Sequence, residues 1–392
     1  MPFTLPDPLR SADKQALVLA FGMLSVLEVC ATVGGVKKVE VPCERICVLD
    51  LQPSSIRSIT KLAGIHKFAP LMAEFHGDQA SVEELVSKIA AEVDTLQRFA
   101  LSGYDVPEER HEEITRLLLD AIRRAGFRKV KLLRPKGNEL LAEQVSSREA
   151  LDLVVFPYKG GYGLGPTCWV SDTASVKERG LAKPVPHSEI AMSPRLAQLL
   201  VNLSGLAPGK TLLDPFCGSG TILAEGLFKS LVCVGVDSDA GRIRDARKNL
   251  GWARSRAGRG TFSLKLGDAR ELPSLLGRSS VDGVVTEPLL LPTFESRPST
   301  KVANELMETA GETYAEALSS IAETLTPGAR VVMVVPVVRT IEDDEVSIAL
   351  DGGRLGLRPF QPGAFRFQYP VLLSFESTRW IRRAVYVFES RG

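Results

Sequence analysis

The chain has 392 residues, 44% of them hydrophobic, and a formal net charge of +1 at pH 7. This length is enough for two or three domains with large apolar cores. A charge so close to zero excludes a global electrostatic attraction to nucleic acid, so any such binding must rest on local patches. Among the 6 cysteines only Cys43 and Cys47 are close together. A lone pair of this kind favours buried or surface thiols in a reducing compartment over zinc, and we expect no metal.

The N-terminal segment, MPFTLPDPLRSADK, lacks the basic region and apolar core of a signal peptide. Residues 16–35 are apolar, but Glu28 and several glycines interrupt them, so they are too short and too mixed to span a membrane. A strand followed by a helix is the expected structure here. We therefore expect a cytoplasmic protein that does not contact a membrane.

Short apolar runs broken by turns in residues 1–78 predict a small α+β unit. Within residues 79–182, the stretch 108–127 predicts an amphipathic helix that Gly126 ends, with strands on either side. A connector rich in Lys and Pro is expected at residues 177–189. The apolar positions that follow helical spacing in the predicted helix are Ile114, Leu117, Leu118, Ala121 and Ile122.

From residue 190 onward, strands and helices alternate. Ser193 is a good N-cap and Pro194 a good first residue for one of these helices. Strands separated by helices predict a parallel, doubly wound sheet, and so an α/β, Rossmann-like fold. The end of the chain differs, because strands expected at 368–375 and 382–389 are separated by a turn without a helix. They predict an antiparallel pair at the sheet edge.

The segment LLDPFCGSGTILAEG, residues 212–226, carries the strongest functional signal. A predicted strand ends at Asp214, a turn holds Gly218 and Gly220, and a helix starts near Thr221. Glycines let a ligand come close to the backbone, and a helix N-terminus favours negative charge. The segment therefore predicts a ligand-binding turn at the edge of the sheet.

Two further acids, Asp237 and Asp268, close the next two predicted strands. Acids at successive strand ends suit S-adenosylmethionine, with Asp214 near the ammonium group, Asp237 on the ribose hydroxyls and Asp268 on the adenine amine. A dinucleotide is the nearest rival, but Leu223 stands where its fingerprint requires a small residue. A purely structural role for these acids is the other alternative. The expected cofactor-binding residues are Asp214, Phe216, Gly218, Gly220, Thr221, Asp237, Asp268 and Ala269.

The glycine segment, together with the preceding PHSEIAMSPRLAQLLVNLSGLAPGKTLLD, resembles the THUMP-domain tRNA guanine-N2 methyltransferases, and the close resemblance covers residues 185–290. It implies a ferredoxin-like part over 1–78, a THUMP-like RNA-binding module over 79–182 and a seven-stranded methyltransferase domain over 183–392. The implied activity is methyl transfer from S-adenosylmethionine to the exocyclic N2 of a guanosine in tRNA. Related DNA and ribosomal RNA methyltransferases share the motif, so these substrates stay as alternatives.

The stretch TEPLLLP, residues 286–292, lies where the resembling enzymes have an acid or amide, two prolines and an aromatic ring. Glu287 can accept a hydrogen bond from the target amine, and Pro288 keeps one proline, so both are expected to be catalytic. Leu289 and Leu290 replace the second proline and the ring, and Phe294 is a candidate substitute. The departure leaves open a catalytically weak or inactive tRNA-binding relative.

Residues 123–136 form a basic run without acids in an otherwise neutral chain, which predicts a phosphate-binding face or, alternatively, a solvated helix end and strand edge. The basic residues Arg379, Arg382 and Arg383 either flank the target nucleotide or belong to a charged turn. The expected partner is tRNA, and the protein is a monomer unless it needs an accessory subunit. The expected RNA-binding residues are Arg123, Arg124, Arg128, Lys129, Lys131, Arg134 and Lys136.

Overall fold

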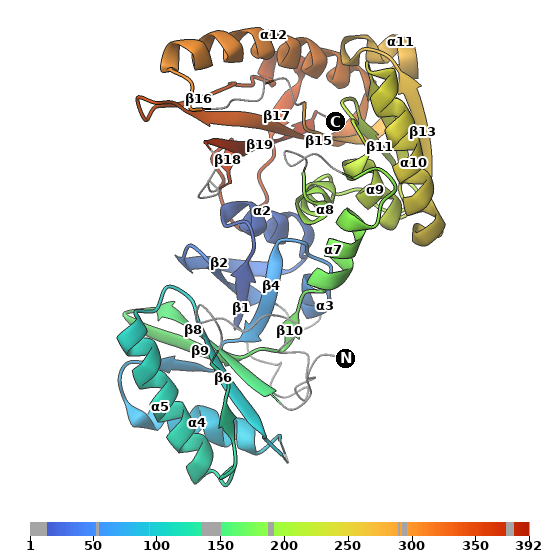
Figure 1. Cartoon of the computed structure of the whole chain (residues 1–392). Helices are drawn as coiled ribbons and strands as arrows, with labels where there is room; N and C mark the ends of the chain where they lie inside the picture. The colour runs from blue at the N-terminus through green and yellow to red at the C-terminus, as the bar shows by residue number, and fades with distance from the viewer. Residues whose placement is uncertain are drawn as a thin grey trace. The chain divides into compact units, whose positions relative to one another are not determined.

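A computed structural model describes residues 14–51, 55–93, 95–134, 150–186, 192–288, 291, 296–373 and 380–391. The chain forms two compact units, Met1–Thr173 with Gly363–Phe365, and Ala174–Pro362 with Arg366–Gly392. Figure 1 shows the elements of both units. The boundaries expected at 78/79 and 182/183 stay a prediction. No helix among the described residues has the length and apolar character needed to cross a membrane.

The first sheet of the first unit has the strand order β10-β4-β1-β3-β2, with every neighbouring pair antiparallel. The apolar run 16–35 folds as expected, into a strand followed by a helix. Gly22, with φ +50°, makes the turn between them. The elements are β1 Lys14–Leu19, α2 Met23–Thr32, β2 Val36–Cys43, β3 Ile46–Leu51, α3 Ile56–Ile59, β4 Ile65–Pro70 and β10 Trp169–Val170.

The second sheet of this unit has the order β5-β9-β8-β6-β7 and is covered by α4 and α5. The amphipathic helix is confirmed: Ile114, Leu118, Ala121 and Ile122 are buried, and Gly126 ends the helix with φ +106°. The elements are β5 Ala73–Phe75, α4 Gln79–Ala90, β6 Arg98–Gly103, α5 Glu108–Arg124, β7 Lys131–Leu132, β8 Ala150–Tyr158 and β9 Gly161–Pro166.

In the second unit the described residues form a sheet of 9 strands, whose main path runs β13-β12-β11-β14-β15-β19-β17. The strands from β13 to β15 are parallel, while β19 is antiparallel to β15. The strands are β11 Thr211–Asp214, β12 Val232–Asp237, β13 Thr261–Leu266, β14 Val281–Thr286, β15 Leu325–Arg339, β16 Glu345–Ser347, β17 Leu357–Pro359, β18 Val371–Leu372 and β19 Ile381–Ser390.

Helices cover both faces of this sheet, with α12 along one face and α8 and α9 on the other (Figure 1). Alternation along the strands explains the two layers, since Val331, Met333 and Val335 of β15 all pack in the core under α12. The helices are α7 Thr173–Leu181, α8 Pro194–Leu203, α9 Thr221–Phe228, α10 Ala240–Ala257, α11 Leu272–Leu276 and α12 Thr300–Thr324, with the short 3-10 helices η3 Ala269–Glu271 and η4 Gly353–Leu355.

The expected Rossmann-like fold with an N-terminal α+β part is confirmed, including the Ser193 cap, whose side chain accepts the Leu196 N–H at 3.2 Å. The antiparallel pair is also confirmed as β18 and β19, although β17 forms the outer edge. The connector prediction was wrong at its start. Residues up to Leu181 are helical in α7, because the prolines that break the helix come only at 184 and 186.

Candidate active site

The acids of the glycine segment lie at one edge of the sheet. Asp214 ends β11 and Asp237 ends β12, and these neighbouring strands run parallel, so both side chains emerge at the same edge. Between β11 and α9 the chain turns through Gly218 and Gly220, which have φ +49° and +85°. Glycine adopts such angles without the steric cost that a side chain brings, so the two glycines favour this turn.

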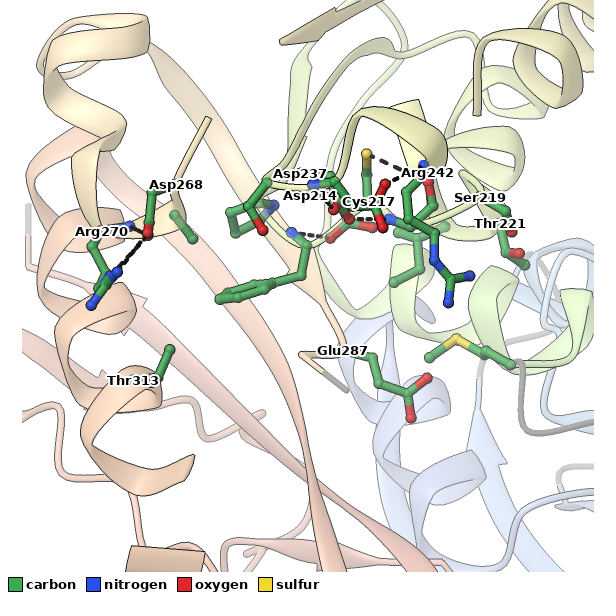
Figure 2. A pocket seen from close by; sticks show the side chains of 18 residues that line it. Asp214, Cys217, Ser219, Thr221, Asp237, Arg242, Asp268, Arg270, Glu287 and Thr313 are labelled. Atoms are coloured by element: carbon green, nitrogen blue, oxygen red, sulfur yellow. Dashed lines mark hydrogen bonds and ion pairs between the residues drawn. The ribbon is translucent and has the colours of Figure 1, made fainter. Parts of the chain in front are cut away.

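A pocket of about 430 Å³ opens at this edge, within the ~300–1,000 Å³ usual for small-molecule sites. Figure 2 shows its lining side chains. All expected cofactor-binding residues line it except Gly220, which is the N-cap of α9. The lining residues are Met192, Asp214, Pro215, Phe216, Cys217, Gly218, Ser219, Thr221, Ile222, Asp237, Ser238, Asp239, Arg242, Asp268, Ala269, Arg270, Glu287 and Thr313.

Asp214 is a buried carboxylic acid, with only 1% of its surface exposed. Its Oδ1 accepts the Thr286 hydroxyl at 2.8 Å and the Phe216 N–H at 3.2 Å. Among the described residues, Oδ2 has no hydrogen-bond donor. Burial raises the pKa of Asp214 to about 7, against the opposing effect of these two hydrogen bonds. The side chain therefore offers an acceptor oxygen to a cationic ligand in the pocket.

Asp237 holds the glycine turn in place. Its Oδ2 accepts the Gly218 N–H at 2.8 Å, and its Oδ1 accepts the Asp239 N–H at 3.0 Å. The Gly218 N–H is thus directed to Asp237. Each carboxylate oxygen still has lone-pair capacity left for a ligand hydroxyl.

Asp268, predicted to accept the adenine amine, forms an ion pair with Arg270. The guanidinium of Arg270 donates from Nε to Oδ1 at 3.0 Å and from Nη2 to Oδ2 at 2.7 Å, and it also reaches Glu316 at 3.4 Å. Arg270 lowers the pKa of Asp268 through this hydrogen-bonded pair. Figure 2 shows the pair at one end of the cavity, apart from Asp214 and Asp237.

Glu287 follows the end of β14 and lines the pocket. It pairs with Arg383 of β19, whose Nε donates to Oε1 at 2.5 Å and whose Nη2 lies 3.5 Å from Oε2. Burial raises the pKa of Glu287, and the charge and hydrogen bond of Arg383 act in the opposite direction. The predicted acceptor is therefore in the pocket, with a cation beside it.

Pro288 is buried, and its carbonyl accepts the hydroxyl of Tyr314, a fully buried residue of α12. This bond ties the loop after β14 to the long helix and uses one of the two lone pairs of the carbonyl. Leu289, Leu290 and the candidate ring Phe294 lie outside the described residues.

The basic run lies in the first unit, at the end of α5 and along the edge strand β7. Arg123 pairs with Asp120 at 3.7 Å, and Arg124 pairs with Glu83 at 3.0 Å, so these two are partly neutralised. Lys136 lies outside the described residues. The remaining members are exposed and form no ion pair within the described ranges; they are Arg128, Lys129, Lys131 and Arg134.

Sequence reasoning missed several residues of the site. Arg270 stands only two positions after Asp268, and this spacing was its only signal. Thr286 and Tyr314 gave no signal, because each acts through a contact with a residue distant in the chain. Arg242 is an exposed cation that lines the pocket, but in the sequence it cannot be distinguished from any other polar residue of a helix. In the described part of the chain, no cluster of three or more His, Cys, Asp or Glu side chains can hold a metal.

Residues 185–343 match the family described as RMKL-like, methyltransferase domain. The tRNA (guanine(10)-N2)-dimethyltransferase of Methanothermobacter thermautotrophicus is 34% identical over 146 residues, 37% of this chain and 39% of that protein. A probable enzyme of the same name from Methanothermococcus thermolithotrophicus is 39% identical over 97 residues, 24% of this chain and 59% of that protein. The chain thus spans less than two thirds of the length of either relative.

Among solved structures, TrmN from Thermus thermophilus is similar with a TM-score of 0.54 and 17% identity, covering 96% of this chain and 99% of that one. A possible methylase from Clostridium difficile 630 gives a TM-score of 0.51 at 14% identity, covering 97% and 98%. At such identities the likeness shows the fold alone. It extends over both units of the chain.

Proposed function

We propose that this chain, which carries an RMKL-like methyltransferase domain over residues 185–343, transfers a methyl group from S-adenosylmethionine to the exocyclic N2 of a guanosine in tRNA. The observation that carries the proposal is the pocket in which Asp214, Asp237 and Glu287 meet beside a glycine turn. The names of the two archaeal relatives support guanosine in tRNA as the substrate.

The residues of the pocket fit the cofactor. Asp214 is a buried residue that accepts the Thr286 hydroxyl and the Phe216 N–H on Oδ1, so Oδ2 can accept the ammonium group of the methionine part. Asp237 can accept the ribose hydroxyls, and Asp268 can accept the adenine amine with the lone pairs that Arg270 leaves. When bound, S-adenosylmethionine supplies a methyl group on a positively charged sulfur.

Glu287 is the residue proposed to act on the substrate amine. The lone pair of a guanine N2 is delocalised into the ring, so an acceptor that takes one N–H favours the tetrahedral nitrogen needed for attack on the methyl carbon. As the new N–C bond replaces the bond between the methyl carbon and the sulfur, N2 loses a proton, and the Glu287 carboxylate would take it. Its raised pKa suits this role, because a base titrating nearer to neutrality transfers protons more effectively.

The proposed RNA contact is the exposed basic cluster Arg128, Lys129, Lys131 and Arg134 of the first unit. Residues 1–78 and 79–182 are proposed as the ferredoxin-like part and the THUMP-like module, and the α+β sheets of this unit support that layout. The proposed location is the cytoplasm, where tRNA is available. The protein acts either alone or with an accessory subunit.

A second candidate function is tRNA binding without turnover. The observation that favours it is Arg383, which already occupies the proposed acceptor Glu287. The two functions differ in whether this ion pair still permits the amine to bind.

The test is transfer of labelled methyl from S-adenosylmethionine to tRNA, ribosomal RNA and DNA, with mass spectrometry of the product nucleosides. Guanosine methylated at N2, found only with tRNA, is the expected result. Methylation of DNA or ribosomal RNA would show that the protein is a methyltransferase of that substrate. Cofactor binding without any methylated product would support the second candidate function.

Two variants separate the cofactor site from the chemistry. We expect Asp237→Ala to weaken S-adenosylmethionine binding about tenfold or more, because hydrogen bonds to a charged group contribute ~1.5–3 kcal/mol each. We expect Glu287→Ala to reduce turnover by about 10²-fold or more while leaving cofactor affinity unchanged. Calorimetry and single-turnover rates measure the two effects. Full activity of Glu287→Ala would remove this residue from catalysis.

A further inference from the structure

The ion pair between Glu287 and Arg383 joins two segments of the second unit that are distant in the sequence. Glu287 follows β14, and Arg383 belongs to β19, which pairs with β15 over nine successive positions from Arg330 to Val338. The register sets Arg383 opposite Pro336. Because β19 is anchored along this length, the backbone that carries the guanidinium is rigid.

The contact is unequal on the two carboxylate oxygens. Nε of Arg383 donates to Oε1 at 2.5 Å, whereas Nη2 is 3.5 Å from Oε2, at the outer limit of a hydrogen bond. A carboxylate offers about four lone-pair sites, so Oε2 retains most of its capacity. One oxygen is thus fixed by the arginine, and the other is left to accept a donor.

Both side chains are largely removed from water, with 17% of Glu287 and 23% of Arg383 exposed. An ionised carboxylate at this depth is stable only with a cation or several donors beside it. Burial raises the pKa of Glu287, and the charge and hydrogen bond of Arg383 lower it in part. Without the arginine, Glu287 would keep its proton to higher pH and would present a hydroxyl in place of a pure acceptor.

We infer that Arg383 is a positioning residue for the proposed methyl transfer, fixing Oε1 of Glu287 so that Oε2 accepts the amine of the substrate. This inference rests on the proposed function, because Glu287 is assigned to the amine only there. Arg383 acts through Glu287 and does not line the pocket itself. Sequence spacing gives no hint of the pair, since 96 positions separate the two residues.

The test compares the wild-type enzyme with Arg383→Met and Arg383→Lys. We expect Arg383→Met to lower kcat at neutral pH by about tenfold or more, to leave the affinity for S-adenosylmethionine unchanged, and to move the acidic limb of the kcat profile to higher pH. Arg383→Lys restores the charge without the fork of donors, so it should return the limb toward the wild-type position and recover part of kcat.

Arg358→Met is the matched control. Arg358 pairs with Glu389 of β19 at 2.9 Å, so this variant also removes a guanidinium from an ion pair with β19. Arg358 lies on the edge strand β17. We expect it to leave both kcat and the pH profile unchanged.

Two outcomes overturn the inference while leaving the proposed function in place. An unshifted pH limb in Arg383→Met would show that the arginine does not control Glu287, and a rise in kcat would make Arg383 a competitor of the amine. If the wild type methylates no substrate, the proposed function fails, and the positioning role fails with it.

The ion pair itself has a readout that does not need activity. We expect Arg383→Met to lower the melting temperature at pH 8 and to have little effect at pH 4, where Glu287 is protonated, because removing one partner strands a buried charge. In a Glu287→Gln background the pH dependence should vanish. An equal loss at both pH values would refute the coupling of the two charges.

Discussion

Asp214 shows how a single residue can couple stability to ligand binding. Its carboxyl is buried at the end of β11, and its folded-state pKa of about 7 lies well above the ~3.9 of an exposed aspartate. The folded protein therefore prefers the protonated acid. An ammonium group in the pocket would reverse this preference, so the acid is suited to bind a cation.

The pH dependence has a definite sign. Because the folded pKa is raised, the stabilisation from Asp214 is complete below about pH 4 and is lost as pH rises toward 7. We expect the wild type to lose stability relative to Asp214→Asn over this range, by up to a few kcal/mol, since one pKa unit corresponds to ~1.4 kcal/mol. Urea unfolding at several pH values measures the difference. If the unfolding free energies of the wild type and Asp214→Asn changed with pH in the same way, Asp214 would not be a buried acid that is protonated in the folded state. The variant Glu312→Gln, at an exposed position, serves as the control.

Among the elements, the two sheets of the first unit are joined by a buried polar cluster. Nζ of Lys67, on β4, donates to Asp152 of β8 at 3.1 Å and to Ser102 of β6 at 3.0 Å, and Thr167 donates to the same carboxylate at 2.7 Å. Lys67 and Asp152 are each only 2% exposed. The apolar core around them includes Val18 and Phe156.

Such a pair stabilises the unit only while both partners remain. We expect Lys67→Met or Asp152→Leu alone to destabilise the first unit by about 3–5 kcal/mol, because each strands a buried charge. The double variant should lose much less than the sum of the two. Equilibrium urea unfolding gives the three values. An additive double variant would show that the two charges do not interact.

At the scale of the whole molecule, a net charge of +1 means that the proposed RNA binding depends on a local surface. The proposed surface consists of the exposed cations that follow α5 and lie on β7, at the outer edge of the second sheet. Each phosphate contact contributes to the salt dependence of binding, independent of base sequence.

We expect neutralising Arg128, Lys129 and Lys131 together with glutamine to weaken tRNA binding and to reduce the slope of log K against log salt by about 2–3 units, at ~0.7–0.9 per contact. Filter binding over a series of salt concentrations measures this slope. The control neutralises Lys37, Arg57 and Lys61, which are also exposed and belong to the same unit. Equal slopes of log K against log salt for the two triple variants would show that the cluster Arg128, Lys129 and Lys131 does not bind RNA phosphates.

Local patterns were sufficient for much of the fold. The helix of residues 108–124 follows from its apolar spacing, and α8 from the Ser193 cap and Pro194. The connector was misassigned because a polar helix without buried residues, such as α7, has no apolar period to detect. The edge strand β17 was not predicted either, because its three residues are too few to show the alternation of apolar and polar side chains that marks a strand.

By itself, the sequence determined that Asp214, Asp237 and the glycine turn share one sheet edge, because parallel strands align their ends and glycine adopts the turn at no steric cost. Only the tertiary structure decided which groups these acids meet: Thr286 beside Asp214, Arg270 on Asp268, and Arg383 on Glu287. Side-chain pairing across strands and helices depends on packing distances of a few ångströms, and the linear order of residues does not encode these distances locally.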